Sequence, residues 1–269
     1  MIIVRGGGDI ATGTIHRLYR CGYDVLILET DRPTAIRRRV AFCEAVYDGT
    51  AVVEGVACSS VETEEQCRRM WDLRRIPLMV DPEGKTIGKM HPDAVIDAIL
   101  AKKNLGTNRG MAPLTVALGP GFCAGEDVDY VIETMRGHDL ARILERGTAQ
   151  PNTGIPGLIA GYGAERVIHA PADGIICLKA DIGDVVEQGQ MLAEIISDGE
   201  RTSVPATLSG VLRGIIRDGF YVSKGLKIAD IDPRKEQKKN CDTISDKSRC
   251  IAGSVLEVLV RKNIKRDRI

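Results

Sequence analysis

The stretch RGGGDIATG, residues 5–13, combines the residue types and the spacing of a turn that holds phosphate groups. It matches the pattern GxGxxA at Gly6, Gly8 and Ala11. In such a turn the first glycine permits a tight bend, the second lets the backbone approach a pyrophosphate, and the N–H groups that begin the next helix bind the anion. The sequence therefore predicts that this glycine turn (residues 6–11) binds a dinucleotide; a plain strand-to-helix connection is the alternative.

An acidic residue follows the glycine turn at the distance typical of dinucleotide sites. Glu29 ends the apolar run at residues 25–28, and a carboxylate there can accept hydrogen bonds from a ribose diol, which favours NAD over NADP. Arg32 and the arginines at 37–39 lie just beyond. They could clamp a phosphate, including a 2′-phosphate, or form a solvated helix face. The cofactor-binding residues expected from this pattern are Gly6, Gly7, Gly8, Asp9, Ile10, Ala11, Glu29 and Arg32.

Three cysteines are candidates for a catalytic thiol. Cys123 lies in the glycine loop GPGFCAGED, Cys43 follows a basic run, and Cys250 follows Arg249. Backbone dipoles and nearby cations lower the pKa of a thiol and favour the thiolate. For Cys123 and Cys250 a structural role is the alternative. The eight cysteines of the chain include no CxxC pair, which disfavours a zinc ribbon, and no metal site is expected.

Short apolar runs and helical patterns alternate along the first 150 residues and would position these side chains. Strands are expected near residues 2–4, 25–28, 51–53, 76–80 and 114–118, and helices near 62–73 and 93–102. This alternation predicts a parallel sheet with helices on both faces, a Rossmann-like nucleotide-binding domain over residues 1–150. Ligands of such sheets bind at the carboxyl ends of the strands.

The sequence changes character after a connector rich in glycine and proline at residues 149–163. APADGIICLKADIGDVVEQGQMLAEI and VPATLSGVLRGIIRDGFYVSKGLKIADI form an internal repeat of short strands and turns. The repeat resembles the biotinyl/lipoyl domain, a barrel-sandwich hybrid, over residues 165–233. Gly199 stands after Asp198 where that family carries its modified lysine, so biotin and lipoate are not expected as cofactors.

The C-terminal part predicts an amphipathic helix over residues 241–264 that packs on the first domain. Ile251, Val255 and Leu259 recur at helical spacing, and Ser245 can cap the helix start. The expected fold class is therefore α/β: a Rossmann-like parallel-sheet domain, then a small all-β barrel-sandwich hybrid of the biotinyl/lipoyl kind, then a C-terminal helix.

Composition limits the partners of the chain. The 37 lysines and arginines balance 37 aspartates and glutamates, so no global field would attract nucleic acid. No apolar segment approaches the roughly 18 residues that a membrane span requires, and the first residues do not form a signal peptide. The sequence predicts a cytoplasmic protein without a membrane or nucleic-acid partner. A homo-oligomer stays open.

Motifs spread over nearly the whole chain resemble those of the YqeB family, whose members are known as selenium-dependent molybdenum hydroxylase system proteins. The motifs are RGGGDIATG, ETDRPTAIRRRVAFCEAVYDG, ALGPGFCAG, IETMRGHDLARI, QPNTGIPG, GLKIADIDPR and CxTISDKxRCIAG. The resemblance implies an accessory protein that matures molybdenum hydroxylases, similar in role to the XdhC group, which handles molybdenum cofactor. It carries over no catalytic residue.

Together, the glycine turn and the resemblance favour a molybdopterin dinucleotide as ligand and a molybdenum hydroxylase as client. Cys43, Cys123 or Cys250 would then face the metal end of the ligand for insertion of sulfur or selenium. Two alternatives stay open: an NAD(P)-dependent oxidoreductase, and a noncatalytic adaptor that senses a nucleotide. Whether the chain is an enzyme is not decided by its sequence.

Overall fold

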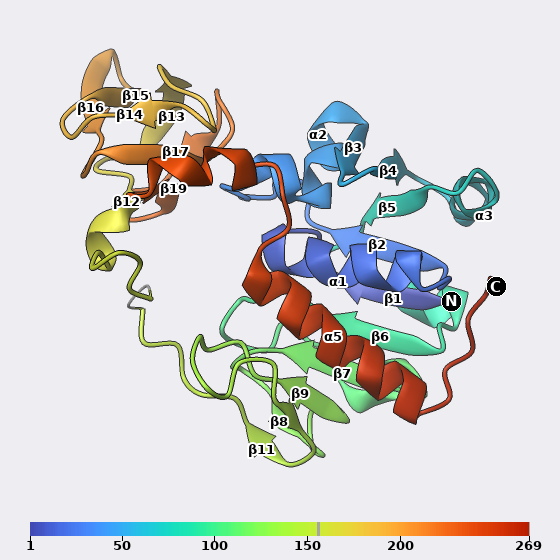
Figure 1. The fold of residues 1–269 in the computed structure, drawn as a ribbon. Helices are drawn as coiled ribbons and strands as arrows, with labels where there is room; N and C mark the ends of the chain where they lie inside the picture. Colours follow the sequence, from blue (N-terminus) through green and yellow to red (C-terminus); the bar gives the residue numbers. More distant parts are fainter. Residues whose placement is uncertain (155–156, 269) are drawn as a thin grey trace. The chain divides into compact units, whose positions relative to one another are not determined.

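The computed structural model describes residues 1–154 and 157–268, which form two compact units (Figure 1). Unit 1 comprises Met1–Pro33, Ala41–Thr153 and Ile244–Ile269, and unit 2 comprises Thr34–Val40 and Gly154–Thr243. Residues 155–156 of the glycine- and proline-rich connector lie outside the described residues.

Unit 1 is built on a nine-stranded mixed sheet with the order β10-β9-β7-β6-β1-β2-β5-β4-β3. The inner strands run parallel, and the edge strands β3 and β10 pair antiparallel with their neighbours. The strands are β1 (Ile2–Arg5), β2 (Val25–Glu29), β3 (Thr50–Val53), β4 (Val56–Val61), β5 (Ile76–Val80), β6 (Ala94–Asp97), β7 (Thr115–Leu118), β9 (Tyr130–Ile132) and β10 (Ile143–Leu144), with a separate pair of β8 (Cys123–Ala124) and β11 (Gly147–Thr148).

Near-continuous apolar runs form the central strands because both faces of this part of the sheet are covered. All four residues of β1 and of β6 are buried. The helices of unit 1 are α1 (Asp9–Arg20), α2 (Ala45–Asp48), α3 (Glu64–Asp72), α4 (Ile87–Met90) and α5 (Asp246–Arg261), with the 3-10 helices η2 (Phe42–Glu44) and η3 (Arg109–Met111).

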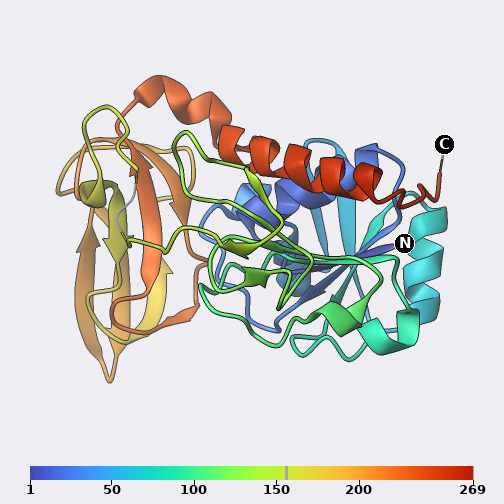
Figure 2. The ribbon, with the colours of Figure 1, turned by 90° about the horizontal axis from the view of Figure 1, so that it is seen from below.

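Side-chain caps begin the helices where the sequence supplies them. Thr63 and Gln66 form a reciprocal capping box at the start of α3, and the Ser245 hydroxyl accepts a hydrogen bond from the Ser248 N–H at the start of α5. The apolar stripe of α5 includes Ile251 and Val255, both fully buried. Helix α5 packs along α1 (Figure 2), so the C-terminal helix completes the covering of this part of unit 1.

The helix expected over residues 93–102 is wrong. Residues 94–97 form strand β6, which pairs with β1 on one side and β7 on the other, and Leu100 and Lys102 then adopt left-handed backbone conformations. The run Ala-Val-Ile-Asp is short and half β-branched. A central position between two strands outweighs its helical spacing.

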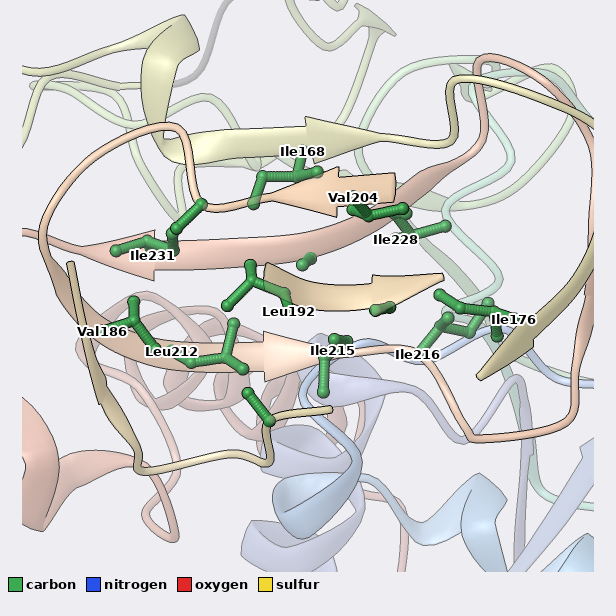
Figure 3. Close-up of a cluster of buried hydrophobic side chains, with 14 of the residues drawn as sticks. Ile168, Ile176, Val186, Leu192, Val204, Leu212, Ile215, Ile216, Ile228 and Ile231 are labelled. Carbon is green, nitrogen blue, oxygen red and sulfur yellow. The ribbon is translucent and has the colours of Figure 1, made fainter. Parts of the chain in front are cut away.

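Unit 2 contains two four-stranded antiparallel sheets with the orders β12-β19-β17-β14 and β16-β15-β13-β18. A cluster of buried aliphatic side chains fills it, among them Leu192, Leu212 and Ile231 (Figure 3). Its strands are β12 (Val167–His169), β13 (Gly174–Leu178), β14 (Val185–Val186), β15 (Met191–Ser197), β16 (Glu200–Pro205), β17 (Gly210–Ile215), β18 (Tyr221–Val222) and β19 (Lys227–Asp232), with the 3-10 helices η1 (Arg38–Val40), η4 (Ala164–Arg166) and η5 (Lys235–Asn240).

The predicted fold class is wrong: the chain is not the combination of a Rossmann-like parallel-sheet domain with a biotinyl/lipoyl-like barrel-sandwich hybrid. The large sheet is mixed, and several antiparallel sheets accompany it. In the described residues from β6 to β10 the connections contain no α-helix, so the helix-covered βαβ repeat expected there is absent. Apolar runs predict strands, whereas strand order and direction depend on pairing with distant residues.

Among the residues that the structure describes, no helix combines the length and the apolar character needed to cross a lipid bilayer.

Candidate functional site

The first two glycines of the glycine turn are required by the backbone around them. Gly6 has a φ of +98°, and a Cβ added there would lie 2.8 Å from the Ala98 carbonyl oxygen. A Cβ on Gly7 would lie 3.1 Å from the Cys43 nitrogen, which donates a 2.9 Å hydrogen bond to the Gly7 carbonyl. Close packing therefore explains both glycines without a ligand.

Gly8 has no such structural reason to be glycine. Its φ of −70° and ψ of −176° are an extended conformation that any residue adopts, and no atom lies within 4 Å of an added Cβ. Gly8 is also the N-cap of α1 but provides no capping side chain. The space at the start of α1 is therefore open, next to backbone N–H groups that a helix leaves without intrahelical partners.

The buried hydroxyl of Thr12 holds the glycine turn in place. Thr12 Oγ1 donates to the Gly7 carbonyl at 3.1 Å and accepts from the Phe42 N–H at 2.9 Å. Thr12 and Phe42 are fully buried. The position of the turn is thus fixed against η2 rather than left to the flexibility of three successive glycines.

Glu29 lies at the turn, as its position at the end of β2 requires. One carboxylate oxygen accepts the Gly7 N–H at 2.7 Å, and the other accepts the Thr30 N–H at 2.8 Å. Burial raises the pKa of Glu29, and these two hydrogen bonds act in the opposite direction. A phosphate cannot use the Gly7 N–H while Glu29 occupies it. The carboxylate suits a ligand hydroxyl, and an anion would have to bind further along, at Gly8 and the start of α1.

Of the remaining residues predicted to bind a cofactor, Asp9 and Ile10 are partly buried in the first turn of α1 and Ala11 is buried. Arg32 follows β2 and is exposed. The arginines at 37–39 belong to unit 2, where Arg38 and Arg39 each form an ion pair with Asp181 at 3.1 Å.

Cys43 is the one predicted thiol that the described contacts bring to the glycine turn, through its backbone N–H. Its side chain is buried, and desolvation together with the charges of Glu29 and Glu44 raises its pKa well above the ordinary value. The expectation that a basic run would lower this pKa is wrong, because burial and acidic neighbours dominate.

Cys123 and Cys250 are more accessible. Cys123 lies on β8, its N–H donates to Asp127 at 2.8 Å, and desolvation together with Glu126 raises the pKa of its thiol. Cys250 lies on α5 and is exposed. The thiol of Cys250 is the one that solvent or a partner protein reaches most readily.

A buried charge network at the same edge of the sheet was not predicted. Arg5, at the end of β1, is 1% exposed. Its guanidinium donates to Thr107 Oγ1 at 2.5 Å and to the Pro82 carbonyl at 2.9 Å, and lies 3.9 Å from the carboxylate of Asp97. Thr107 in turn donates to Asp97 at 2.5 Å. An arginine that ends an otherwise apolar strand is the sequence signal that could have indicated this network.

Burial raises the pKa of Asp97, and its hydrogen bonds to Thr107 and the Ile99 N–H, with the charge of Arg5, counteract the shift. The network joins the end of β1, which precedes the glycine turn, to the segments that follow β5 and β6. In the described residues no group of three or more His, Cys, Asp or Glu side chains is placed to hold a metal ion.

No family model matches the chain. Among curated proteins, the uncharacterized protein YqeB of Escherichia coli (strain K12) is 46% identical over 260 residues, which cover 97% of this chain and 47% of YqeB. This similarity supports membership of the YqeB family. The chain spans about half the length of that relative. The similarity does not extend to a role with molybdenum hydroxylases, because YqeB is described as uncharacterized.

Solved structures give weak similarities. The apo ectoine utilization protein EutE (DoeB) of Ruegeria pomeroyi is 11% identical, with 86% of this chain and 85% of that chain covered and a TM-score of 0.27. An aspartoacylase family protein of Mesorhizobium loti is 13% identical, with 86% and 83% covered and a TM-score of 0.30. A succinylglutamate desuccinylase/aspartoacylase of Rhodobacter sphaeroides is 12% identical, with 86% and 84% covered and a TM-score of 0.29. At such TM-scores these matches carry no inference about the fold or the activity of this chain.

Proposed function

We propose that this chain is an accessory protein in the maturation of selenium-dependent molybdenum hydroxylases and binds a dinucleotide at the glycine turn. A molybdopterin dinucleotide is the first candidate ligand. The observation that carries the proposal is the open space at Gly8, a glycine that neither its backbone conformation nor its neighbours require. The link to molybdenum hydroxylases comes from the motifs that resemble the YqeB family, and the similarity to YqeB itself supports only membership of that family.

The chemistry of the turn divides the ligand between two subsites. The carboxylate of Glu29 can accept hydrogen bonds from ribose hydroxyls, since each of its oxygens has a further lone pair after accepting one backbone N–H. The pyrophosphate would bind at Gly8, where the first N–H groups of α1 and the helix dipole favour negative charge. The ribose and the phosphate of one nucleotide are adjacent groups, so this division suits a ligand that contains a nucleotide, as a dinucleotide does.

A role for a thiol in inserting sulfur or selenium remains part of the proposal, with Cys123 and Cys250 as the accessible candidates. Reaction requires the thiolate. The Cys43 thiol is buried and its pKa is raised well above the ordinary value, so Cys43 would contribute shape to the site rather than a nucleophile.

One observation favours a second candidate function, an NAD-dependent oxidoreductase. Glu29 is placed for a ribose diol, which is the feature that distinguishes NAD from NADP. A noncatalytic adaptor that senses a nucleotide would use the same turn and need no cysteine.

Native mass spectrometry of the purified protein distinguishes these functions. We expect a bound molybdopterin dinucleotide in the wild type and its loss in Gly8→Asp, because a carboxylate at the start of α1 fills the space and repels phosphate. Gly253→Asp is the matched control: this glycine of α5 also has open space around an added Cβ and no positive φ.

Retention of NAD instead would support the oxidoreductase. Tight dinucleotide binding that persists in Gly8→Asp would contradict the placement at the glycine turn. Normal maturation of a molybdenum hydroxylase by a variant with Cys43, Cys123 and Cys250 all replaced by serine would exclude the thiol role and favour the adaptor.

A further inference from the structure

The first turn of α5 carries a lysine that neither capping nor ion pairing explains. Ser245 is the N-cap, Asp246 follows it, and Lys247 is the second residue of the helix. A cation at this end opposes the helix dipole, which favours acidic residues in the first turn. Within the described part of the chain, the ammonium group of Lys247 makes no hydrogen bond or ion pair with another residue.

The surroundings of Lys247 disfavour its charge further. Its side chain is partly buried, and desolvation, followed by the positive charge of Arg136, lowers its pKa. The charges of Asp9, Glu133 and Asp246 act in the opposite direction but are weaker than the desolvation. These five residues come from the start of α1, the segment after β9 and the start of α5.

Two of the neighbouring acids already have other partners. Glu133 is 3% exposed, and its two carboxylate oxygens accept the N–H groups of Met135 at 2.6 Å and Gln150 at 2.7 Å. Asp246 accepts both guanidinium N–H groups of Arg136, at 2.9 and 3.0 Å. Lys247 therefore lies near several charged side chains, and none of them forms an ion pair with its ammonium group.

The start of α5 is fixed against the start of α1, which places this lysine beside the glycine turn. The Ser248 hydroxyl donates to the carbonyl oxygens of Asp9, at 3.2 Å, and Ile10, at 3.0 Å. A Cβ on Gly13 would collide with Ser248, so this glycine permits the close approach of the two helices. Lys247 immediately precedes Ser248. The charge of Asp9, the first residue of α1 after Gly8, acts on the Lys247 ammonium and opposes the lowering of its pKa.

We propose that Lys247 binds the phosphate of the ligand held at the glycine turn, and that the ligand class is a nucleoside diphosphate or a dinucleotide built on one. The inference rests on the proposed function and adds the residue that recognises the anionic group. The lysine gains the counterion that the protein does not supply, and the phosphate gains a cation beside the N–H donors at Gly8 and the start of α1. A partly desolvated lysine without a counterion, at the helix end that disfavours positive charge, lowers stability. Local features of this kind are typical of functional sites.

Isothermal titration calorimetry with ADP and adenosine as probes tests this role. We expect Lys247→Gln to weaken ADP binding roughly tenfold to a hundredfold, the range for loss of one charged hydrogen bond. Adenosine binding should not change, because adenosine has no phosphate. Lys247→Arg keeps the positive charge and should restore part of the affinity for ADP.

Lys262→Gln is the matched control, since Lys262 is the C-cap residue of the same helix and its ammonium lies 5.3 Å from the centre of the Tyr130 ring. It should bind ADP as the wild type does. Thermal unfolding of each variant separates lost affinity from lost structure.

The outcomes distinguish the inference from the proposed function. If Gly8→Asp abolishes ADP binding and Lys247→Gln does not weaken it, the role of Lys247 is overturned and the binding turn stands. If Lys247→Gln weakens binding and Gly8→Asp leaves it unchanged, the lysine binds phosphate and the placement at the turn is wrong. If the wild type binds neither probe, both are overturned.

Selective acylation of lysines, followed by mass spectrometry as a function of pH, gives a second readout that does not depend on affinity. Lys247 should react at lower pH than Lys262, because desolvation lowers the pKa of the first and the contact with Tyr130 raises that of the second. ADP should protect Lys247 alone. Equal protection of both lysines, or of neither, would contradict the proposal.

Discussion

Replacement of Arg5 by methionine should destabilise the protein strongly, because it leaves a buried carboxylate without its cation. The side chains of Arg5 and Asp97 are each 2% exposed. Removing one partner of a buried ion pair costs about 3–5 kcal/mol, and we expect the free energy of unfolding of Arg5→Met to fall by that amount at pH 7. Chemical unfolding in urea, followed by circular dichroism, measures the change.

The double variant Arg5→Met/Asp97→Asn separates the unpaired charge from the lost contacts. An asparagine oxygen can still accept the Thr107 hydroxyl, so the main remaining loss is the three hydrogen bonds that Arg5 donates to Thr107 Oγ1 and to the carbonyls of Pro82 and Leu105. At about 1 kcal/mol for each hydrogen bond, the double variant should lose about 3 kcal/mol, and Arg5→Met loses the same bonds and also leaves the Asp97 carboxylate unpaired. It should therefore be more stable than Arg5→Met alone, although it carries one more substitution.

The pH dependence has a defined sign. Burial raises the pKa of Asp97 in the folded protein, and loss of the Arg5 charge raises it further. A carboxyl whose pKa is higher in the folded state takes up a proton on folding, so lowering the pH through this pKa stabilises the folded state. The destabilisation of Arg5→Met should shrink between pH 7 and pH 5. A double variant less stable than Arg5→Met, or a loss below about 1 kcal/mol for Arg5→Met, would refute the reasoning.

Three further predictions concern the glycine turn, the thiols and a helix cap. Gly6→Ala should cost roughly 1–3 kcal/mol in urea unfolding because of the +98° φ and the contact with the residue-98 carbonyl, whereas Gly8→Ala should cost less than about 1 kcal/mol; equal losses would contradict the distinction between the two glycines. In the folded protein at pH 8, iodoacetamide should modify Cys250, which is exposed, and leave Cys43 unmodified, because burial raises its pKa and excludes the reagent; peptide mass spectrometry measures both, and early modification of Cys43 would show that its burial is wrong. Thr63→Ala should remove the cap of α3 and lower the free energy of unfolding by about 1 kcal/mol, and Thr63→Ser should retain most of it.

Local patterns in the sequence identified several elements of unit 1. Strands β1, β2 and β5, the turn into α1 and the C-terminal helix were expected at or near their observed positions. Each depends on residues close together in the chain: an apolar run, a glycine where φ is positive, a serine before an amphipathic stretch. The placement of Glu29 at the turn follows in the same way, because β2 brings its end alongside that of β1.

The fold class and much of the candidate site depend on contacts between distant residues. Strand β6 was mistaken for a helix because its pairing with β1 and β7 is absent from its own four residues. Asp97 consequently could not be placed beside Arg5. The pKa of Cys43 was expected to fall because basic residues precede it in sequence, whereas Arg38 and Arg39 bind Asp181 and the thiol is buried near Glu29.

The sequence by itself determined where the backbone can turn tightly at Gly6, where α5 begins and which family the motifs resemble. Only the tertiary structure decided that the large sheet is mixed, that Gly8 borders open space and that Ser248 binds the first turn of α1, which places Lys247 beside the glycine turn. The physical reason is the range of the interactions. Backbone conformation and capping depend on neighbours a few residues away, whereas desolvation, charge pairing and open space depend on which distant segments the fold packs together.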